Sequence, residues 1–146
     1  MKLRFLMALC IGAAASASWA QLSPIGTWRT VDDKTGEAKS EIVITEQDGV
    51  VSGRITRLLR AEADPQGVCS ACTDDRKDQP LVGLEIIRGA RQVEGRAVWE
   101  DGRILDPENG KTYTLRLTPK DEGRQLNVRG SFGPFGRTQT WTRVNP

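Results

Sequence analysis

The stretch RILDPENGKTYTLRL, residues 103–117, contains two strand-like segments joined by a short turn. The turn, residues 106–110, includes a proline and an Asn-Gly pair, and both favour a tight reversal of the backbone. In the segment that follows, Tyr113, Leu115 and Leu117 alternate with polar residues, which is typical of a strand with one buried face. This stretch therefore predicts an antiparallel β-hairpin with these three side chains facing the interior.

Strand-like segments separated by turn signals continue this pattern over most of the chain. Further turns are predicted at residues 47–49 and 133–136. Beyond residue 20, no stretch shows a helical period over a dozen residues, so strand follows strand directly. We therefore expect an all-β fold, a small antiparallel up-and-down β-barrel of eight to nine strands. The predicted strands are residues 26–31, 40–45, 50–58, 81–87, 93–99, 103–105, 111–117, 125–131 and 137–143.

The first 20 residues have the features of a secretory signal peptide. Lys2 and Arg4 form a basic start, residues 3–17 apart from Arg4 are apolar or small, and Ser18-Trp19-Ala20 offers small residues at a cleavage site. The apolar run is shorter than the ~20 residues of a membrane-spanning helix. We therefore expect cleavage of residues 1–20, a single barrel domain at residues 21–146, and localisation to the periplasm or the extracellular space.

Without Lys2 and Arg4, the chain keeps 19 of its 21 basic residues beside 19 acidic ones, so the mature protein is formally neutral. A neutral chain without a basic block lacks the positive surface typical of nucleic-acid binding. It also lacks a polybasic patch for anionic lipid. We expect no nucleic-acid partner and no stable membrane insertion, and the sequence identifies no protein partner.

Two of the three cysteines, Cys69 and Cys72, remain in the mature chain, in the long irregular segment 60–80. In an oxidising compartment such a pair favours a structural disulfide, which would stabilise the fold by about 2 kcal/mol. A redox-active pair normally lies at a helix N-terminus, whereas loop-like sequence surrounds this one. A zinc site would need Asp74 and Asp75 as further ligands. The disulfide is the expected state, both alternatives stay open, and we expect no cofactor.

The sequence contains no histidine, which excludes several enzyme classes. Ser-His-Asp and Cys-His nucleophilic sites are impossible, and the usual acid–base side chain at neutral pH is missing. No catalytic residue is predicted. Thiol–disulfide exchange through Cys69 and Cys72 is the remaining enzymatic hypothesis.

Short motifs along nearly the whole mature chain resemble, in the expected order, the bacterial exported family called domain of unknown function 2147. The resemblance implies a lipocalin-like β-barrel and no established reaction or ligand. The opening Gly26-Thr27-Trp28 and the closing Arg143 are also similar to the wider calycin pattern of lipocalins and avidins, which implies that Trp28 is a core residue of the barrel floor. The motifs are GTWRT (26–30), DKTG (33–36), KS (39–40), GRI (53–55), CSAC (69–72), VG (82–83), GRILDPENGKTY (102–113), VRG (128–130) and GRTQTW (136–141).

Two hypotheses about function follow from a barrel, which is either hollow or filled. The first is an exported protein that binds a small, partly apolar molecule in the barrel, with or without an anionic group such as a carboxylate. The second is an envelope or secreted interaction module with a filled barrel and a disulfide-pinned recognition loop. The predicted ligand contacts of the first hypothesis are Trp28, Trp99, Tyr113, Arg129, Trp141 and Arg143.

Arginines on the last two predicted strands leave a further question open. Arg129, Arg137 and Arg143 either converge on an anionic group or form salt bridges with acidic residues. Arg143 could instead stack on Trp28 as a cation–π plug.

Overall fold

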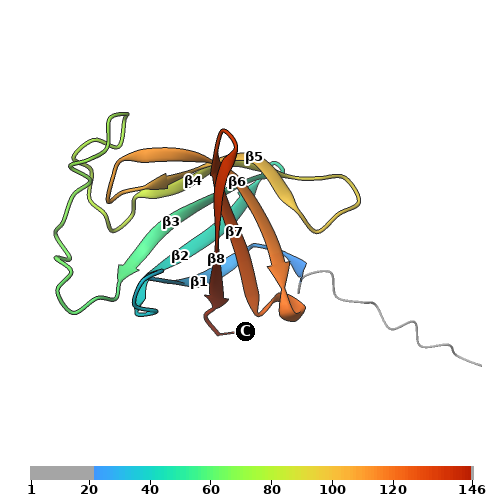
Figure 1. Ribbon diagram of the computed structural model, residues 1–146, viewed down its shortest axis with the longest axis horizontal. Coiled ribbons are helices and arrows are strands. Elements are labelled where there is room, and N and C mark those ends of the chain that lie inside the picture. Colours follow the sequence, from blue (N-terminus) through green and yellow to red (C-terminus); the bar gives the residue numbers. More distant parts are fainter. Residues whose placement is uncertain (1–21, 146) are drawn as a thin grey trace, which may run out of the picture.

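The computed structural model describes residues 22–145 and contains a closed antiparallel β-barrel of eight strands (Figure 1). Each strand pairs with the next along the chain, and the last pairs with the first. The expected all-β barrel is therefore confirmed. The predicted signal peptide and its cleavage site lie outside the described residues. The strands are β1 (Gly26–Val31), β2 (Ala38–Gln47), β3 (Val50–Leu58), β4 (Glu85–Gln92), β5 (Trp99–Asp106), β6 (Lys111–Lys120), β7 (Gln125–Phe132) and β8 (Phe135–Arg143), with a 3-10 turn, η2 (Asp121–Gly123), between β6 and β7.

The structure differs from the prediction between residues 81 and 99. Residues 81–84 still belong to the long connection after β3, and β4 starts only at Glu85. They form a turn, in which the Leu84 N–H donates to the Leu81 carbonyl at 3.1 Å and Gly83 has φ +95°. The predicted strand at residues 93–99 is wrong. Residues 93–98 form the turn between β4 and β5, closed by a hydrogen bond from the Val93 N–H to the Val98 carbonyl at 2.8 Å, with Gly95 at φ +71°.

The barrel interior follows the predicted alternation of faces. Leu115 and Leu117 of β6 are fully buried, and Leu126 and Val128 of β7 are buried beside them. Burial of these large apolar side chains is the main stabilising contribution to such a fold. The largest fully buried apolar side chains are Trp28, Ile42, Ile44, Ile87, Leu115, Leu117, Leu126 and Val51.

One end of the barrel is closed by the two chain ends. The Trp28 indole N–H donates to the Pro24 carbonyl at 2.7 Å, and the guanidinium of Arg143 lies over the Trp28 ring. Gly26 has φ +137°, and the Arg143 guanidinium occupies the space that a side chain at residue 26 would need. The Gly-x-Trp motif and the closing arginine therefore form one structural unit.

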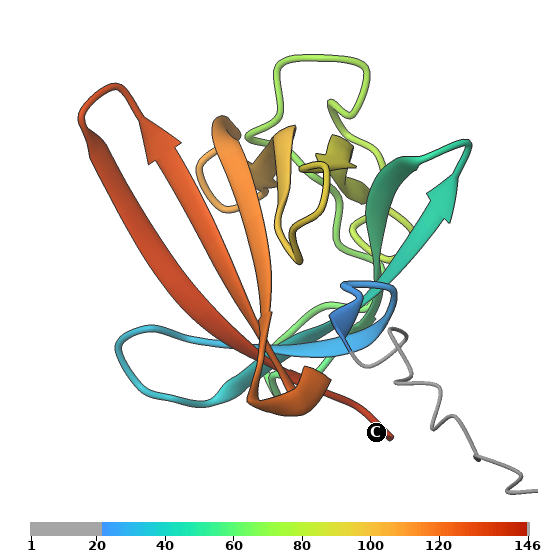
Figure 2. The same ribbon diagram turned by 90° about the vertical axis from the view of Figure 1, so that its right-hand side faces the viewer.

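The other end of the barrel carries the connections β1–β2, β3–β4, β5–β6 and β7–β8. Figure 2 shows the β7–β8 hairpin extending beyond its neighbouring strands. Within residues 22–145, no helix is long and apolar enough to cross a membrane.

Candidate functional site

A cavity of about 670 Å³ opens at the end of the barrel that carries the β1–β2, β3–β4, β5–β6 and β7–β8 connections. The deep part of the cavity is apolar, because aliphatic and aromatic side chains of β2 to β5, β7 and β8 line it. Each of these side chains is at most 5 % exposed. Such a volume and such a lining are typical of small-molecule sites in proteins. The buried apolar lining residues are Ile42, Ile55, Ile86, Leu105, Val128 and Trp141.

Two hydroxyl groups interrupt the apolar wall. Thr30 of β1 and Ser40 of β2 lie opposite each other in the sheet, and their side-chain oxygens are 2.8 Å apart. Both residues line the cavity and are less than 9 % exposed. Because each hydroxyl already has a partner in the other, the pair adds polarity to the wall without an unsatisfied buried group.

A chain of hydrogen bonds runs along β8 from the depth of the cavity to its rim. The Trp141 indole N–H donates to the Gln139 side-chain oxygen at 3.0 Å, and the Gln139 amide donates to Asp33 at 2.9 Å. The same oxygen of Asp33 lies 2.8 Å from a guanidinium nitrogen of Arg137. Asp33 belongs to the β1–β2 connection, so these contacts hold that connection against β8.

An ion-pair network continues along the rim from the neighbouring residue, Asp32. Arg60 pairs with Asp32, and Glu108 of the β5–β6 turn pairs with both Arg60, at 3.4 Å, and Lys39, at 2.9 Å. Two backbone N–H groups of its own loop, together with the Arg60 guanidinium, hold the pKa of Asp32 below its ordinary value. The network therefore joins three of the four connections around the open end.

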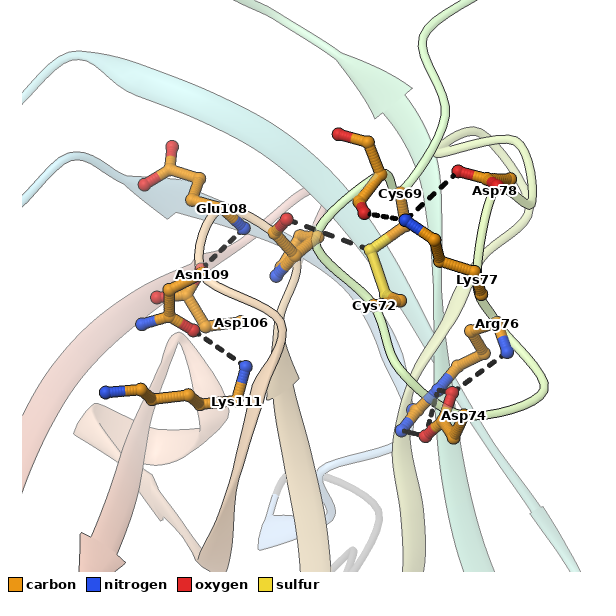
Figure 3. The surroundings of a disulfide bond; sticks show 12 residues. Cys69, Cys72, Asp74, Arg76, Lys77, Asp78, Asp106, Glu108, Asn109 and Lys111 are labelled. Atoms are coloured by element: carbon orange, nitrogen blue, oxygen red, sulfur yellow. Dashed lines mark hydrogen bonds and ion pairs between the residues drawn. A yellow bond between two sulfur atoms is a disulfide. The ribbon is translucent and has the colours of Figure 1, made fainter.

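The long connection between β3 and β4 contains the expected disulfide between Cys69 and Cys72. Both cysteines are buried, and the Cys69 sulfur lies 3.8 Å from the carbonyl oxygen of Pro107 in the β5–β6 turn (Figure 3). The Ala71 carbonyl lies against Gly110 of the same turn. The disulfide thus packs the β3–β4 connection against the rim of the cavity, outside its lining.

Arg76 supports this connection from within. It is only 6 % exposed, and its guanidinium donates to the Glu85 carbonyl at 2.9 Å and to the Asp74 carboxylate at 2.5 Å. The hydrogen bonds from Arg76 lower the pKa of Asp74 to about 2. A buried arginine whose three side-chain nitrogens all donate hydrogen bonds is a structural element of the loop.

The sequence profile of the family described as "Uncharacterized protein conserved in bacteria (DUF2147)" matches residues 26–143. The chain belongs to this family. Its fold is similar to the solved structure of protein HP1028 from Helicobacter pylori, which is described as belonging to the lipocalin family. The two chains have 18 % identity and a TM-score of 0.70, with coverage of 83 % of this chain and 82 % of HP1028. No curated protein matches the sequence.

The DUF2147 barrel brings only two of the six predicted ligand contacts to the cavity. Trp141 lies in its depth, and Tyr113 lines its mouth, where its hydroxyl accepts a hydrogen bond from the Asn109 amide at 3.2 Å. The other four do not line it. Trp28 and Arg143 close the opposite end, and Trp99 is a buried core residue at the start of β5.

The arginines of the last two strands do not converge. Arg129 is exposed and donates to the Thr138 hydroxyl at 3.4 Å, because it belongs to the outward-facing set of β7. Arg137 and Arg143 share one face of β8 but are six residues apart, which corresponds to ~20 Å along a strand. Arg137 forms a salt bridge, and Arg143 forms the cation–π plug.

Several cavity residues of this DUF2147 protein are not among the predicted contacts. Gln139 and Asp33 form the hydrogen-bonded chain, and the Thr30–Ser40 pair lies in the wall. Gln139 is two residues from Trp141 on a strand, so period-two spacing alone would place both on one face. The aliphatic lining carries no sequence signal that separates it from solid core.

Proposed function

We propose that the protein is an exported small-molecule-binding protein whose barrel holds a partly apolar, amphipathic ligand. The cavity of about 670 Å³, with an apolar depth and hydrogen-bonding groups at its mouth, carries this proposal. The lipocalin-like fold supports it, and the volume favours it over a filled barrel. Export rests on the predicted signal peptide and agrees with a disulfide-bonded structure.

The apolar part of the ligand would lie against Trp141, Val128 and Ile42, where it displaces water from an apolar wall. The polar part would lie near Tyr113 and Arg137 at the mouth. Arg137 already pairs with Asp33, so an anionic ligand group would have to share the guanidinium with that carboxylate. Binding of an anionic ligand group at Arg137 is therefore a separate prediction with a test of its own.

Two fluorescent probes of similar size distinguish apolar binding in the cavity from binding of an anionic group at Arg137. N-phenyl-1-naphthylamine is neutral, whereas 1-anilinonaphthalene-8-sulfonate carries a negative charge. We expect both to bind the mature protein, and we expect Arg137→Gln to weaken only the sulfonate. Equal loss of both probes in Arg137→Gln would contradict an anionic preference while leaving the cavity proposal intact.

Gly130 offers a direct way to fill the cavity. It lines the cavity, and a Cβ at this position would make an ordinary 3.4 Å contact with Tyr113. We expect Gly130→Leu to abolish binding of both probes with little change in thermal stability. Ser131→Leu, on the neighbouring residue outside the cavity lining, is the matched control and should bind as the wild type does. Wild-type-like binding by Gly130→Leu, or no binding by the wild type, would sink the proposal.

Native mass spectrometry of the protein purified from its own host completes the test. A non-covalent adduct that is lost on denaturation gives the mass of the natural ligand. A denatured mass that corresponds to a chain starting at Gln21, two hydrogens lighter than the reduced form, supports export and the disulfide together. A retained N-terminal segment would contradict cleavage after Ala20.

A further inference from the structure

Two phenylalanines form the most exposed large apolar pair of the described residues. Phe132 and Phe135 are 73 % and 77 % exposed, whereas the other exposed large apolar side chains are 39–44 % exposed. Both lie at the tip of the β7–β8 hairpin, which extends beyond its neighbours (Figure 2). Exposed aromatic pairs of this kind mark an interaction site more often than scattered single apolar residues do.

The geometry of the hairpin keeps this pair uncovered. Phe132 pairs with Phe135 across the turn, and Gly133 in the turn has φ +57°. The pairing of β6 with β7 ends at Ser131, and β8 pairs with β1 only near Arg143. The last register position of the hairpin therefore has no neighbouring strand. The aromatic pair is exposed beyond the barrel end, on the face of the hairpin that borders the cavity.

Basic groups without acidic partners lie beside and below the tip. The Arg129 guanidinium occupies the space that a side chain at Gly136 would need, one register position behind the aromatic pair. On the same outer surface, Arg103 donates to the Thr112 and Thr114 hydroxyls. Among residues 22–145, neither arginine forms an ion pair.

Three of the four acidic residues that line the cavity are neutralised by ion pairs, and the fourth is Asp106. Asp33 pairs with Arg137, Asp32 with Arg60, and Glu108 with both Lys39 and Arg60. The charge that the hairpin presents to a partner therefore comes from Arg129, with Arg103 farther from the tip. A negatively charged partner is favoured.

We propose that the β7–β8 tip docks the protein onto an anionic lipid bilayer, with Phe132 and Phe135 at the level of the headgroups and Arg129 beside the lipid phosphates. Phenylalanine is among the apolar side chains that interfacial segments bury at this depth, and a cationic group nearby adds attraction to anionic lipid. A hairpin tip with two aromatic residues is too small to bury the ~1,200 Å² of a stable protein interface. It is well suited to shallow insertion into a soft interface.

Docking of this kind is peripheral and reversible, so it requires neither the polybasic patch that the sequence lacks nor stable insertion. It also does not depend on whether the cavity binds a ligand. Because Phe132 and Phe135 also border the cavity, the docked protein would hold the open end of its barrel close to the lipid surface. A tip that is part of the cavity wall could alternatively serve only the ligand, and the experiment separates these roles.

Vesicle co-sedimentation tests the proposal with phosphatidylcholine vesicles that contain phosphatidylglycerol and with pure phosphatidylcholine vesicles. We expect the mature protein to bind the anionic vesicles more tightly. Phe132→Ser/Phe135→Ser should weaken binding to them by at least about tenfold. Arg129→Gln should weaken it by about fivefold and remove most of the preference for anionic lipid. Val68→Ser/Val82→Ser, a double change at exposed apolar residues of the β3–β4 connection, is the matched control and should bind as the wild type does.

The tryptophan fluorescence of Phe135→Trp shows whether the tip lies in the lipid. Trp28, Trp99 and Trp141 are buried, so only the exposed tryptophan at residue 135 should respond to the vesicles. Its emission should shift to shorter wavelength on anionic vesicles. Absence of vesicle binding by the wild type overturns the proposal, as does unchanged binding by the double serine variant. A loss of probe binding without a loss of vesicle binding assigns the phenylalanines to the cavity instead. A dimer that the serine changes dissolve, seen by analytical ultracentrifugation, assigns them to self-association.

Discussion

The guanidinium carbon of Arg143 lies 4.2 Å from the centroid of the Trp28 ring. The same guanidinium donates to the carbonyls of Gly123, Ile25 and Ser23 at 2.7, 2.7 and 2.8 Å. Burial lowers the pKa of Arg143 from its ordinary value, as expected for a partly desolvated cation. β1 and β8 share only two register pairs, so this side chain supplies much of the contact that closes the barrel.

Replacement of Arg143 should therefore destabilise the barrel. We expect Arg143→Met to lower the free energy of unfolding by about 3 kcal/mol, because it removes charged hydrogen bonds and a cation–π contact. Arg124→Met is the control, since Arg124 is exposed and pairs with Asp121 alone in the described part of the chain. It should cost less than about 1 kcal/mol. Urea denaturation measures both, and equal losses would show that Arg143 is not a plug.

Gly110 and Gly95 test the contact between the β5–β6 turn and the cysteine loop. Their φ angles are nearly equal, +72° and +71°, so alanine strains the backbone similarly at both positions. At Gly110 the Ala71 carbonyl occupies the space of the new methyl group, whereas at Gly95 that space is open. Gly110→Ala should cost about 2 kcal/mol more than Gly95→Ala in chemical denaturation. Equal losses of stability in the two variants would mean that the segment around Ala71 moves away from the new methyl group without a measurable loss of stability.

The disulfide should stabilise the fold without taking part in ligand binding. We expect Cys69→Ala/Cys72→Ala to lose about 3 kcal/mol of stability through a larger unfolded-state entropy and lost packing. Probe binding should persist, because neither cysteine lines the cavity. A redox titration distinguishes the remaining enzymatic hypothesis. A reduction potential near about −180 mV, in the range of disulfide isomerases, would contradict a purely structural bond.

Asp74 should make the stability depend on pH in the acid range. Its pKa in the folded protein is about 2, against an ordinary value of 3.8, so the folded state binds this proton less readily than the unfolded state does. The stabilisation is complete above the ordinary value and is lost as the pH falls toward about 2. Asp74→Asn should be less stable than the wild type at neutral pH and should lose less stability on acidification.

Thermal unfolding over this pH range measures the difference. Asp78→Asn is the control, because this exposed carboxylate on the same loop has Lys77 as its only ion-pair partner among residues 22–145. Its pH profile should run parallel to that of the wild type. A parallel profile for Asp74→Asn as well would show that the Arg76 contact does not protect the Asp74 carboxylate.

Alternation along strands predicts which face a residue occupies, and it does so well in this barrel. It places Leu115, Leu117, Leu126 and Val128 inside, as the structure has them. It also places Arg129 on the face of β7 opposite to that of Val128, so the pattern predicts that Arg129 is exposed. The prediction of Arg129 as a ligand contact conflicts with this pattern. The prediction of a strand at residues 93–99 is wrong because Val93 and Val98 favour strands, while Gly95 turns the chain between them.

Alternation does not predict depth along the barrel axis. Trp28 and Trp141 are both interior residues, but one closes the far end and the other lines the cavity. Depth depends on the register between strands, which is set by bulges such as the one between Glu41 and Ile42. Phe132 likewise has the spacing of an interior residue. It is exposed because the β7–β8 hairpin extends beyond Ser131, where the pairing of β6 with β7 ends. Register is a tertiary property that single strands do not reveal.

The closing contact between Arg143 and Ser23 joins residues that are 120 positions apart in the chain. Contacts of such long sequence separation form late, because the loop between them must first be ordered. Until β8 is in place, β1 has a free edge that can pair with another chain. The barrel therefore completes its folding only after almost the whole chain is available, and the period before that is when the protein is most prone to aggregate.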